Sequence, residues 1–378
     1  MNKLGALAAL LVVAACAQDH TVTGLSADRA PVLRASAAGG EPAMDAPGAV
    51  YALANQASGN AVAIYARAAD GSLTWTGSAP TGGLGAGSSL GSQGALALSD
   101  DGRWLFAVNA GSNDVSAFEV SRGGLALASR VASGGVRPIS LSVHGDVLYV
   151  LNAGGDGNIS GFTFGADGVL TPLAGSTRAL SGSAVGPAQV AFSPDGRWLV
   201  VTEKTTSRLD VYAVGSAGVA GVAMTTPSAG GTPFGFGFGH QDELFVSEAA
   251  GSASSYDIAA DGSLRVASGA VVTHQGAPCW AVVTKNGKFG YTANAQGGSI
   301  SGFAIANDGA ISLIDGDGRT AIVGGGNIDL ALSGNSRYLY QLNGDRSISG
   351  FRIEADGHLT AAGRTAAMPS STVGLVAR

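Results

Sequence analysis

The chain repeats one unit with a period of about 47 residues, and this repeat limits the possible folds more than any other feature. Each unit starts with an apolar strand, a turn and a second apolar strand; the six copies read LALSDDGRWLFAVN, ISLSVHGDVLYVLN, QVAFSPDGRWLVVTE, FGFGHQDELFVSE, AVVTKNGKFGYTAN and LALSGNSRYLYQLN. A third strand follows, and a turn such as Asp-Gly then leads to a fourth. Asp-Gly and Asn-Gly suit hairpins because both central residues of the favoured turn have a positive φ. Four short strands in about 40–50 residues are typical of a propeller blade.

The two ends of the repeat region together make one more unit. Residues 50–78 supply a second, third and fourth strand, and residues 371–378 supply a first strand alone. The strands are apolar on both faces, which fits blades that pack between neighbours. We therefore predict an all-β fold over residues 49–378, a seven-bladed β-propeller of four-stranded blades, whose ring closes where the C-terminal strand joins the N-terminal strands.

The N-terminus has the build of an export signal. One Lys precedes an apolar run from Leu4 to Ala15, too short to span a bilayer core of about 30 Å as a helix. The run ends in Val-Ala-Ala-Cys16, which resembles the lipobox of bacterial lipoproteins. We expect residues 1–16 to be a signal peptide with Cys16 as the lipidated residue, and residues 17–48 to be a flexible tether. Plain secretion with a chance Cys is the alternative.

Localisation and partners follow from the same residues. Because Ala17 rather than Asp follows Cys16, the lipoprotein resemblance implies the bacterial outer membrane, with the protein facing the periplasm. Membrane contact is then expected through the lipid anchor only. The net charge of −6 argues against a nucleic-acid partner, which requires a basic face. We expect a monomer that binds a small molecule or an envelope protein.

One mouth of the central channel is the expected functional site. The starts of first strands and the ends of second strands meet there, because each second strand returns to the face from which its first strand began. The second strands end in Asn55, Asn109, Asn152, Glu203, Glu248, Asn294 and Asn343. The first strands start near Gln93, Arg137, Gln189, Phe234, Cys279 with Trp280, and Asp329.

Structural roles compete with functional ones at these positions. Asn side chains often cap a following turn, and that reading covers the five Asn. The two Glu could bind a cation, act as acid and base, or pair with Lys204 and Arg137. His274 is the only His expected on the mouth side, where an imidazole would serve as a general base; a surface His without a role is the alternative. The sequence contains no zinc-type His/Cys cluster.

The second-strand ends YVLN, FAVN, YTAN and YQLN resemble the repeat named YVTN, and the stretch GPAQVAFSPDGRWLVVTEKTTSRLDVY is similar to the lactonase-type seven-bladed propellers, the family of 6-phosphogluconolactonase and a fungal muconate cycloisomerase. The resemblance implies lactone hydrolysis, with Glu203 at the position of a family carboxylate. The Arg and His that the family places at Pro187-Ala188-Gln189 are missing here.

Two functions are therefore expected from the sequence: an exported lactonase-like hydrolase, or a non-catalytic lipid-anchored propeller that binds a ligand or an envelope protein. The catalytic candidates are Glu203, His274 and Arg137. The ligand-binding candidates are Glu248, Lys204, Asn109, Asn152, Asn294, Asn343, Gln93 and Asp329. No cofactor is expected; a Ca²⁺ ion held by the Glu and Asn oxygens is a third option.

Overall fold

A computed structural model describes residues 46–239 and 243–378 as an all-β structure. The expected signal peptide with Cys16, and all but the last three residues of the expected tether, lie outside these residues. The described chain forms thirty β-strands in seven separate sheets. Within this part of the chain, no helix is long and apolar enough to cross a membrane.

Each sheet is one blade, and the blades are numbered here in chain order. Blade 1 contains β1 (Gly48–Leu53), β2 (Ala61–Arg67), β3 (Leu73–Pro80) and β30 (Val373–Ala377). Blade 2 contains β4 (Leu96–Leu98), β5 (Trp104–Asn109), β6 (Asp114–Ser121) and β7 (Gly124–Ala132). Blade 3 contains β8 (Val136–His144), β9 (Val147–Gly154), β10 (Asn158–Phe164), β11 (Leu170–Pro172) and β12 (Arg178–Ala179).

The remaining four blades follow the same order. Blade 4 contains β13 (Pro187–Phe192), β14 (Trp198–Glu203), β15 (Arg208–Val214) and β16 (Ala220–Pro227). Blade 5 contains β17 (Pro233–Phe238), β18 (Leu244–Glu248), β19 (Ser252–Ile258) and β20 (Leu264–Val272). Blade 6 contains β21 (Pro278–Val283), β22 (Phe289–Asn294), β23 (Ser299–Ile305), β24 (Ile311–Leu313) and β25 (Ala321–Ile322). Blade 7 contains β26 (Asp329–Leu332), β27 (Tyr338–Leu342), β28 (Ile348–Ile353) and β29 (Leu359–Arg364).

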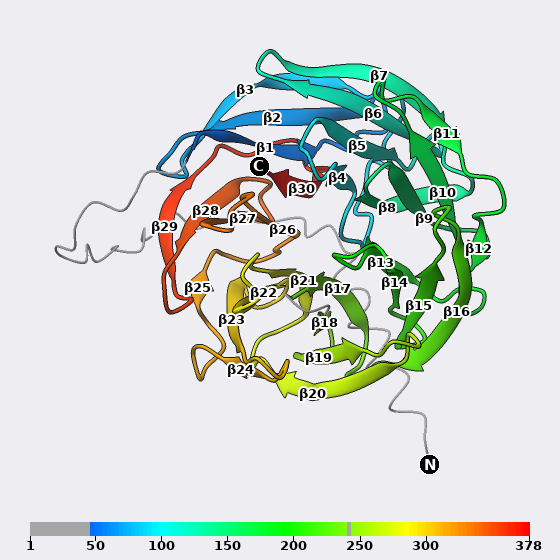
Figure 1. Cartoon of the computed structure of the whole chain (residues 1–378). Helices are drawn as coiled ribbons and strands as arrows, with labels where there is room; N and C mark the ends of the chain where they lie inside the picture. Colours follow the sequence, from blue (N-terminus) through cyan, green and yellow to red (C-terminus); the bar gives the residue numbers. More distant parts are fainter. Residues whose placement is uncertain (1–45, 240–242) are drawn as a thin grey trace.

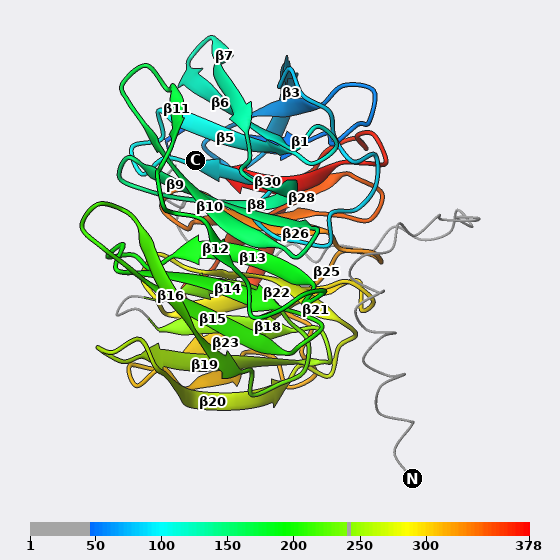
Figure 2. The ribbon, with the colours of Figure 1, turned by 90° about the vertical axis from the view of Figure 1, so that its right-hand side faces the viewer.

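The seven blades form a closed ring around a central axis (Figure 1). The last strand, β30, pairs antiparallel with β1, with Val50 opposite Ala377 and Ala52 opposite Leu375. The C-terminus therefore lies against the first blade, which both views show (Figure 1, Figure 2). The predicted fold, blade number and closure are confirmed.

Recurring glycine-to-aromatic contacts join neighbouring blades. Gly168 lies in the turn after the third strand of blade 3, with a φ of +69°, and packs on the ring of Trp104 in blade 2. A Cβ at Gly168 would lie 2.1 Å from that ring, so only glycine fits. The same arrangement pairs Gly71 with Tyr338, Gly262 with Trp198, and Gly357 with Phe289. The Asp-Gly turns of the repeat thus serve packing between blades as well as chain reversal.

Buried tyrosine hydroxyls provide polar contacts across the same seams. Tyr149 of blade 3 donates to the Gly218 carbonyl at 3.0 Å and accepts from the Ala220 N–H at 2.7 Å in blade 4. Both groups belong to the hairpin between the third and fourth strands. Two further tyrosines act alike, Tyr291 on Gly357 and Tyr340 on Gly71. Each hydroxyl pairs backbone groups that would otherwise be buried without partners.

Replacing Tyr149 by Phe should lower the free energy of unfolding by about 1–3 kcal/mol, because two buried backbone groups lose their partner. Urea unfolding followed by circular dichroism measures the change. Thr171→Val on the exposed strand β11 is the control and should shift stability by less than about 0.5 kcal/mol. Equal stability of the two variants would contradict the bridging role of Tyr149.

Candidate functional site

The linker between blades 1 and 2, residues 81–95, is longer than any other connection between blades, and its segment Ser88–Gly94 lies across the mouth of the channel. We call Ser88–Gly94 the plug. In Figure 1 this cyan linker runs towards the middle of the ring before β4. Its hydrogen bonds reach blades 1, 3, 4 and 6, through Asn55, Ile139, Leu141, Ala188, Lys204, Trp280 and Ala281.

The strongest anchor of the plug is the side-chain amide of Gln93. It donates to the Ala281 carbonyl at 2.6 Å and accepts from the Ala281 N–H at 2.9 Å. The Trp280 indole N–H donates to the Ser92 carbonyl at 2.9 Å. Gly235 of blade 5 allows this close approach, since a Cβ there would lie 2.1 Å from Gln93 Oε1. Gln93 therefore fixes the plug to the far side of the channel.

Lys204 lies under the plug and is buried. Its Nζ donates to the carbonyls of Gly91 and Pro187, both at 2.7 Å, and lies 5.1 Å from the centroid of the Phe234 ring. Burial, and to a smaller extent the charge of Arg137, lower the pKa of the Lys204 ammonium to about 7. This amine is therefore close to titration at neutral pH.

Arg137 is exposed at the edge of the plug. Its Nη2 donates to the Ser89 carbonyl at 3.4 Å, and its backbone N–H donates to Asn113 Oδ1 at 2.7 Å. In the described chain neither Arg137 nor Lys204 has a carboxylate partner. Arg137, together with the protonated form of Lys204, therefore creates a positive local potential at this mouth.

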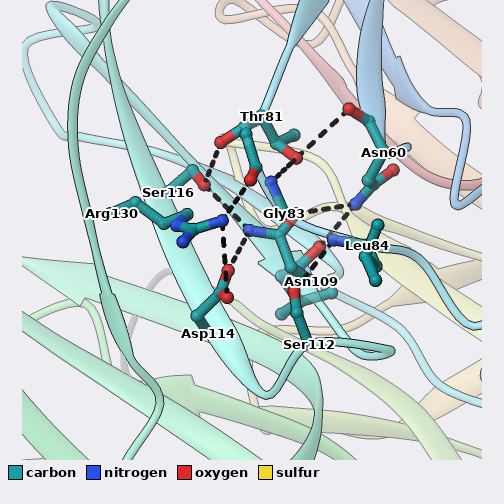
Figure 3. A network of polar contacts seen from close by, with 11 residues as sticks. Asn60, Thr81, Gly83, Leu84, Asn109, Ser112, Asp114, Ser116 and Arg130 are labelled. Carbon is teal, nitrogen blue, oxygen red and sulfur yellow. Dashed lines mark hydrogen bonds and ion pairs between the residues drawn. The ribbon is translucent and has the colours of Figure 1, made fainter. Parts of the chain in front are cut away.

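The second-strand ends of blades 2 to 7 fill the seams between blades, whereas Asn55 of blade 1 contacts the linker before the plug. Asn109 shows the pattern (Figure 3). Its Nδ2 donates to Asp114 Oδ1 at 2.6 Å and to Ser116 Oγ at 2.8 Å, and its Oδ1 accepts from Asn60 at 2.9 Å. The side chain thus ties its own third strand to the preceding blade.

Three further Asn repeat these contacts. Their side-chain amides donate to two polar residues of the following strand: Asn152 to Asn158 and Ser160, Asn294 to Ser299 and Ser301, and Asn343 to Ser347 and Ser349. All of them are buried. These Asn do more than cap the turn that follows them, because the residues to which they donate lie at the start of the third strand.

Glu203 is fully buried and occupies the same kind of seam. Its Oε1 accepts from the Ser181 N–H at 2.9 Å, and its Oε2 accepts from the hydroxyls of Ser181 at 2.5 Å and Thr206 at 2.6 Å. The carboxyl of Asp210 lies beside it. Burial raises the pKa of Asp210 to about 7, and Glu203 adds to this, while a hydrogen bond from Thr225 opposes it. Asp210 therefore keeps its proton to a higher pH than an exposed carboxyl does.

Glu248 is also fully buried. Its Oε1 accepts from the Gly230 N–H and from the hydroxyls of Ser228 and Ser254, and its Oε2 accepts from Ser252. A carboxylate can only accept, so serines and a backbone amide supply every donor. The two Glu thus lie in seams as the Asn do, but their carboxylates accept hydrogen bonds where the Asn side-chain amides donate them.

The first-strand starts bind neighbouring backbones. Asp329 is buried and accepts from the Leu330 N–H at 2.8 Å; burial raises the pKa of this carboxyl well above its usual range. Gln189 donates to the Phe236 carbonyl at 3.1 Å and accepts from its N–H at 2.8 Å. These side chains pair the free edges of innermost strands.

Of the three catalytic candidates, Arg137 and His274 are exposed and Glu203 is buried. No hydrogen bond or ion pair joins any two of them within the described chain. His274 lies in the linker after β20 with a φ of 57°. Their catalytic roles, and the ligand-binding roles of the ring residues, stay predictions.

The plug and Asp210 were not anticipated from the sequence. Asp210 follows Glu203 by seven residues, as Ser116 follows Asn109. An alignment of the repeats could therefore have indicated that Asp210 lies beside Glu203. The plug's signal was only the length and glycine content of its linker. In the described part of the chain, no three His, Cys, Asp or Glu side chains are grouped to hold a metal ion.

Comparisons with known proteins agree with this architecture. The family model described as Lactonase, 7-bladed beta-propeller matches residues 59–185 and 239–317, more than half of the chain. A search of curated protein sequences finds no match.

Three solved structures share the fold. A proposed 6-phosphogluconolactonase of Bacteroides fragilis has a TM-score of 0.71 at 19% identity, covering 89% of this chain and 100% of that chain. The periplasmic gluconolactonase of Pseudomonas aeruginosa has a TM-score of 0.69 at 19% identity, covering 88% and 99%. Hydrazine synthase of Kuenenia stuttgartiensis has a TM-score of 0.54 at 17% identity, covering 73% and 89%, so the architecture alone does not fix a reaction.

Asp210 should make stability depend on pH. Between about pH 4 and 7 the unfolded chain loses this proton while the fold keeps it, so the free energy of unfolding falls as pH rises through this window and then levels off. Asp210→Asn keeps the neutral form and should reduce the fall between pH 4 and 7 by an amount on the order of 2 kcal/mol.

Urea titrations at several pH values measure this effect. Asp146→Asn, in an exposed turn, is the control and should leave the pH profile of the parent chain unchanged. An unaltered profile in Asp210→Asn would show that Asp210 does not titrate in this window.

Proposed function

The chain belongs to the lactonase family of seven-bladed β-propellers, and on this premise we propose that it hydrolyses a negatively charged sugar lactone at the mouth of its channel. The observation that carries the proposal is the exposed cation Arg137 at the plug, with the titratable amine of Lys204 beneath it. Arg137 is exposed there and Lys204 lies beneath it, neither paired with a carboxylate among the described residues. An anionic group on the substrate supplies the missing counter-charge.

Hydrolysis adds water to the lactone carbonyl, passes through a tetrahedral oxyanion, and breaks the ring C–O bond to give a hydroxy acid. Arg137 holds the anionic group of the substrate, and the protonated form of Lys204 beneath the plug adds to the positive potential that stabilises the developing negative charge. A base must accept a proton from water. His274 is the exposed candidate for this role, and Glu203 takes part only through the Ser181 and Thr206 hydroxyls that cover it.

A second function is favoured by one specific observation. Glu203 and Glu248 are both fully buried and saturated by donors of their own seams, so no carboxylate of this pair is open to water. A propeller that binds an anionic ligand or an envelope protein without catalysis needs only the exposed cation. Binding without turnover is therefore the alternative that the test below must separate.

The proposal places the protein outside the cytoplasm, as an envelope lipoprotein anchored by Cys16. Support comes from the signal-like N-terminus and from the likeness to the periplasmic gluconolactonase of Pseudomonas aeruginosa. Labelling with a lipid precursor, with Cys16→Ser as the comparison, tests the anchor. A calcium requirement is tested by adding a chelator to the assay.

The purified full-length chain should open 6-phosphogluconolactone faster than its spontaneous hydrolysis, measured by acid release in a pH-stat. Arg137→Gln should raise KM for this charged lactone by about tenfold, an effect of about 1.4 kcal/mol, and change KM for uncharged gluconolactone much less. Arg103→Gln, an exposed arginine in the first hairpin of blade 2 on the opposite face, is the matched control.

His274→Gln should lower kcat at least about a hundredfold if His274 accepts the proton from water. Glu203→Gln measures the contribution that the buried carboxylate makes through the Ser181 and Thr206 hydroxyls. Calorimetry with the hydrolysed acid reports binding in the same samples. If the hydrolysed acid binds in an Arg137-dependent way and no lactone is turned over, the protein is a binding protein and not a hydrolase. If the chain shows no binding and no turnover, both proposed functions are wrong.

A further inference from the structure

The seam between blades 7 and 1 differs from the other six. In blades 2 to 7, the second-strand end is joined or flanked by polar residues of its third strand: Asp114 and Ser116, Asn158 and Ser160, Asp210, Ser252 and Ser254, Ser299 and Ser301, Ser347 and Ser349. These side chains fill the space towards the preceding blade. The polar filling is thus a regular part of the repeat.

Blade 1 has alanines at the corresponding places, Ala61 and Ala63. Its second-strand end, Asn55, turns to the linker before the plug instead, donating to the Ser88 carbonyl at 2.7 Å and accepting from the Ala86 N–H at 2.8 Å. Nothing polar therefore fills this seam from the third strand. A groove of about 620 Å³ results, lined in part by both alanines.

Both ends of the chain contribute walls to this groove, which we call the closure groove. Strands β2 and β3 provide Tyr65, Leu73 and Trp75, and the linker from β29 to β30 provides Met368 and Pro369. Trp75 is 53% exposed and lies edge-on to Tyr65, with ring centroids 5.4 Å apart. Clefts of about 300–1,000 Å³ with mainly apolar and aromatic walls are typical of small-molecule sites.

One polar side chain, Arg364, gives the closure groove a chemical preference. Arg364 is the only charged lining residue among those described. It forms an ion pair with Asp345 at 2.6 Å through Nη2 and donates from Nε to Ser347, which leaves the N–H donors of Nη1 at the rim for a ligand. Thr372 lines the groove, is 0% exposed, and its hydroxyl has no hydrogen-bond partner within the described residues. Because it is fully buried, this hydroxyl lies behind the wall of the groove and out of contact with a ligand.

We propose that the closure groove is a second binding site, distinct from the mouth, for a small planar aromatic molecule with one negative charge. The aromatic ring packs against Trp75 and Tyr65, where ring pairs are favourable, and the thioether of Met368 adds a sulfur contact. The anionic group reaches Arg364.

Binding at this place acts on ring closure. The ligand touches blade 1 on one side and the linker into β30 on the other, and β30 is the strand that closes the ring. A molecule that binds only the closed ring stabilises it by mass action. The site is therefore expected to raise the unfolding temperature of the whole propeller.

The fluorescent monoanion 8-anilinonaphthalene-1-sulfonate is a suitable probe, because Trp75 is the only exposed tryptophan of the four in the chain. The full-length chain should bind one probe per molecule, with energy transfer from Trp75 and a higher unfolding temperature. Ala63→Leu fills the groove and should weaken binding at least about tenfold. Ala66→Leu, on the same strand but facing away, should bind as the parent does.

A second pair of variants covers the case in which Ala63→Leu does not fold. Ala61→Ser combined with Ala63→Ser restores the polar pair of the other blades and should also weaken probe binding. Arg364→Gln should weaken binding of the probe because its sulfonate loses a cationic partner. Probe binding that is the same in the parent, Ala63→Leu and the double serine variant would overturn the proposal. So would binding that leaves Trp75 emission unchanged.

Discussion

The antiparallel pairing of β30 with β1 is the interaction on which the ring depends. It supplies the innermost strand of blade 1, and it places blade 7 against blade 1. Repeat architectures bury their apolar faces only against neighbours, so an open ring would leave two blades each with an uncovered face. The glycine, aromatic and tyrosine contacts described between neighbouring blades add to this pairing, and two of them, Gly71 with Tyr338 and with Tyr340, lie where blade 7 meets blade 1.

The plug depends on the closed ring in turn. Its hydrogen-bond partners belong to four blades, and the amide of Gln93 meets Ala281 across 188 residues of sequence. These contacts are geometrically possible only once the blades surround the channel. The positive mouth is therefore a product of the whole ring: Lys204 is held by the plug, and its charge and that of Arg137 meet there.

The sequence predicted the blades because hydrophobic pattern and turn residues are local signals. It also predicted that Glu203 ends a second strand. It did not predict where that side chain points, because neighbouring residues of a strand face opposite sides and the choice depends on packing against blade 3. In the structure the two neighbouring side chains separate: the Glu203 carboxylate lies in the seam, and the Lys204 amine lies under the plug. Long-range contacts such as those of Gln93 leave no local pattern.

The position of β1 has a mechanical consequence. The strand lies between β2 and β30, and the Arg67 side chain holds the carbonyls of both Ala46 and Arg378 at its entrance. A force that arrives along the chain before Ala46 is thus shared by two hydrogen-bonded ladders loaded in shear. Because β1 is paired on both sides, traction from this end does not peel a single edge strand from its sheet.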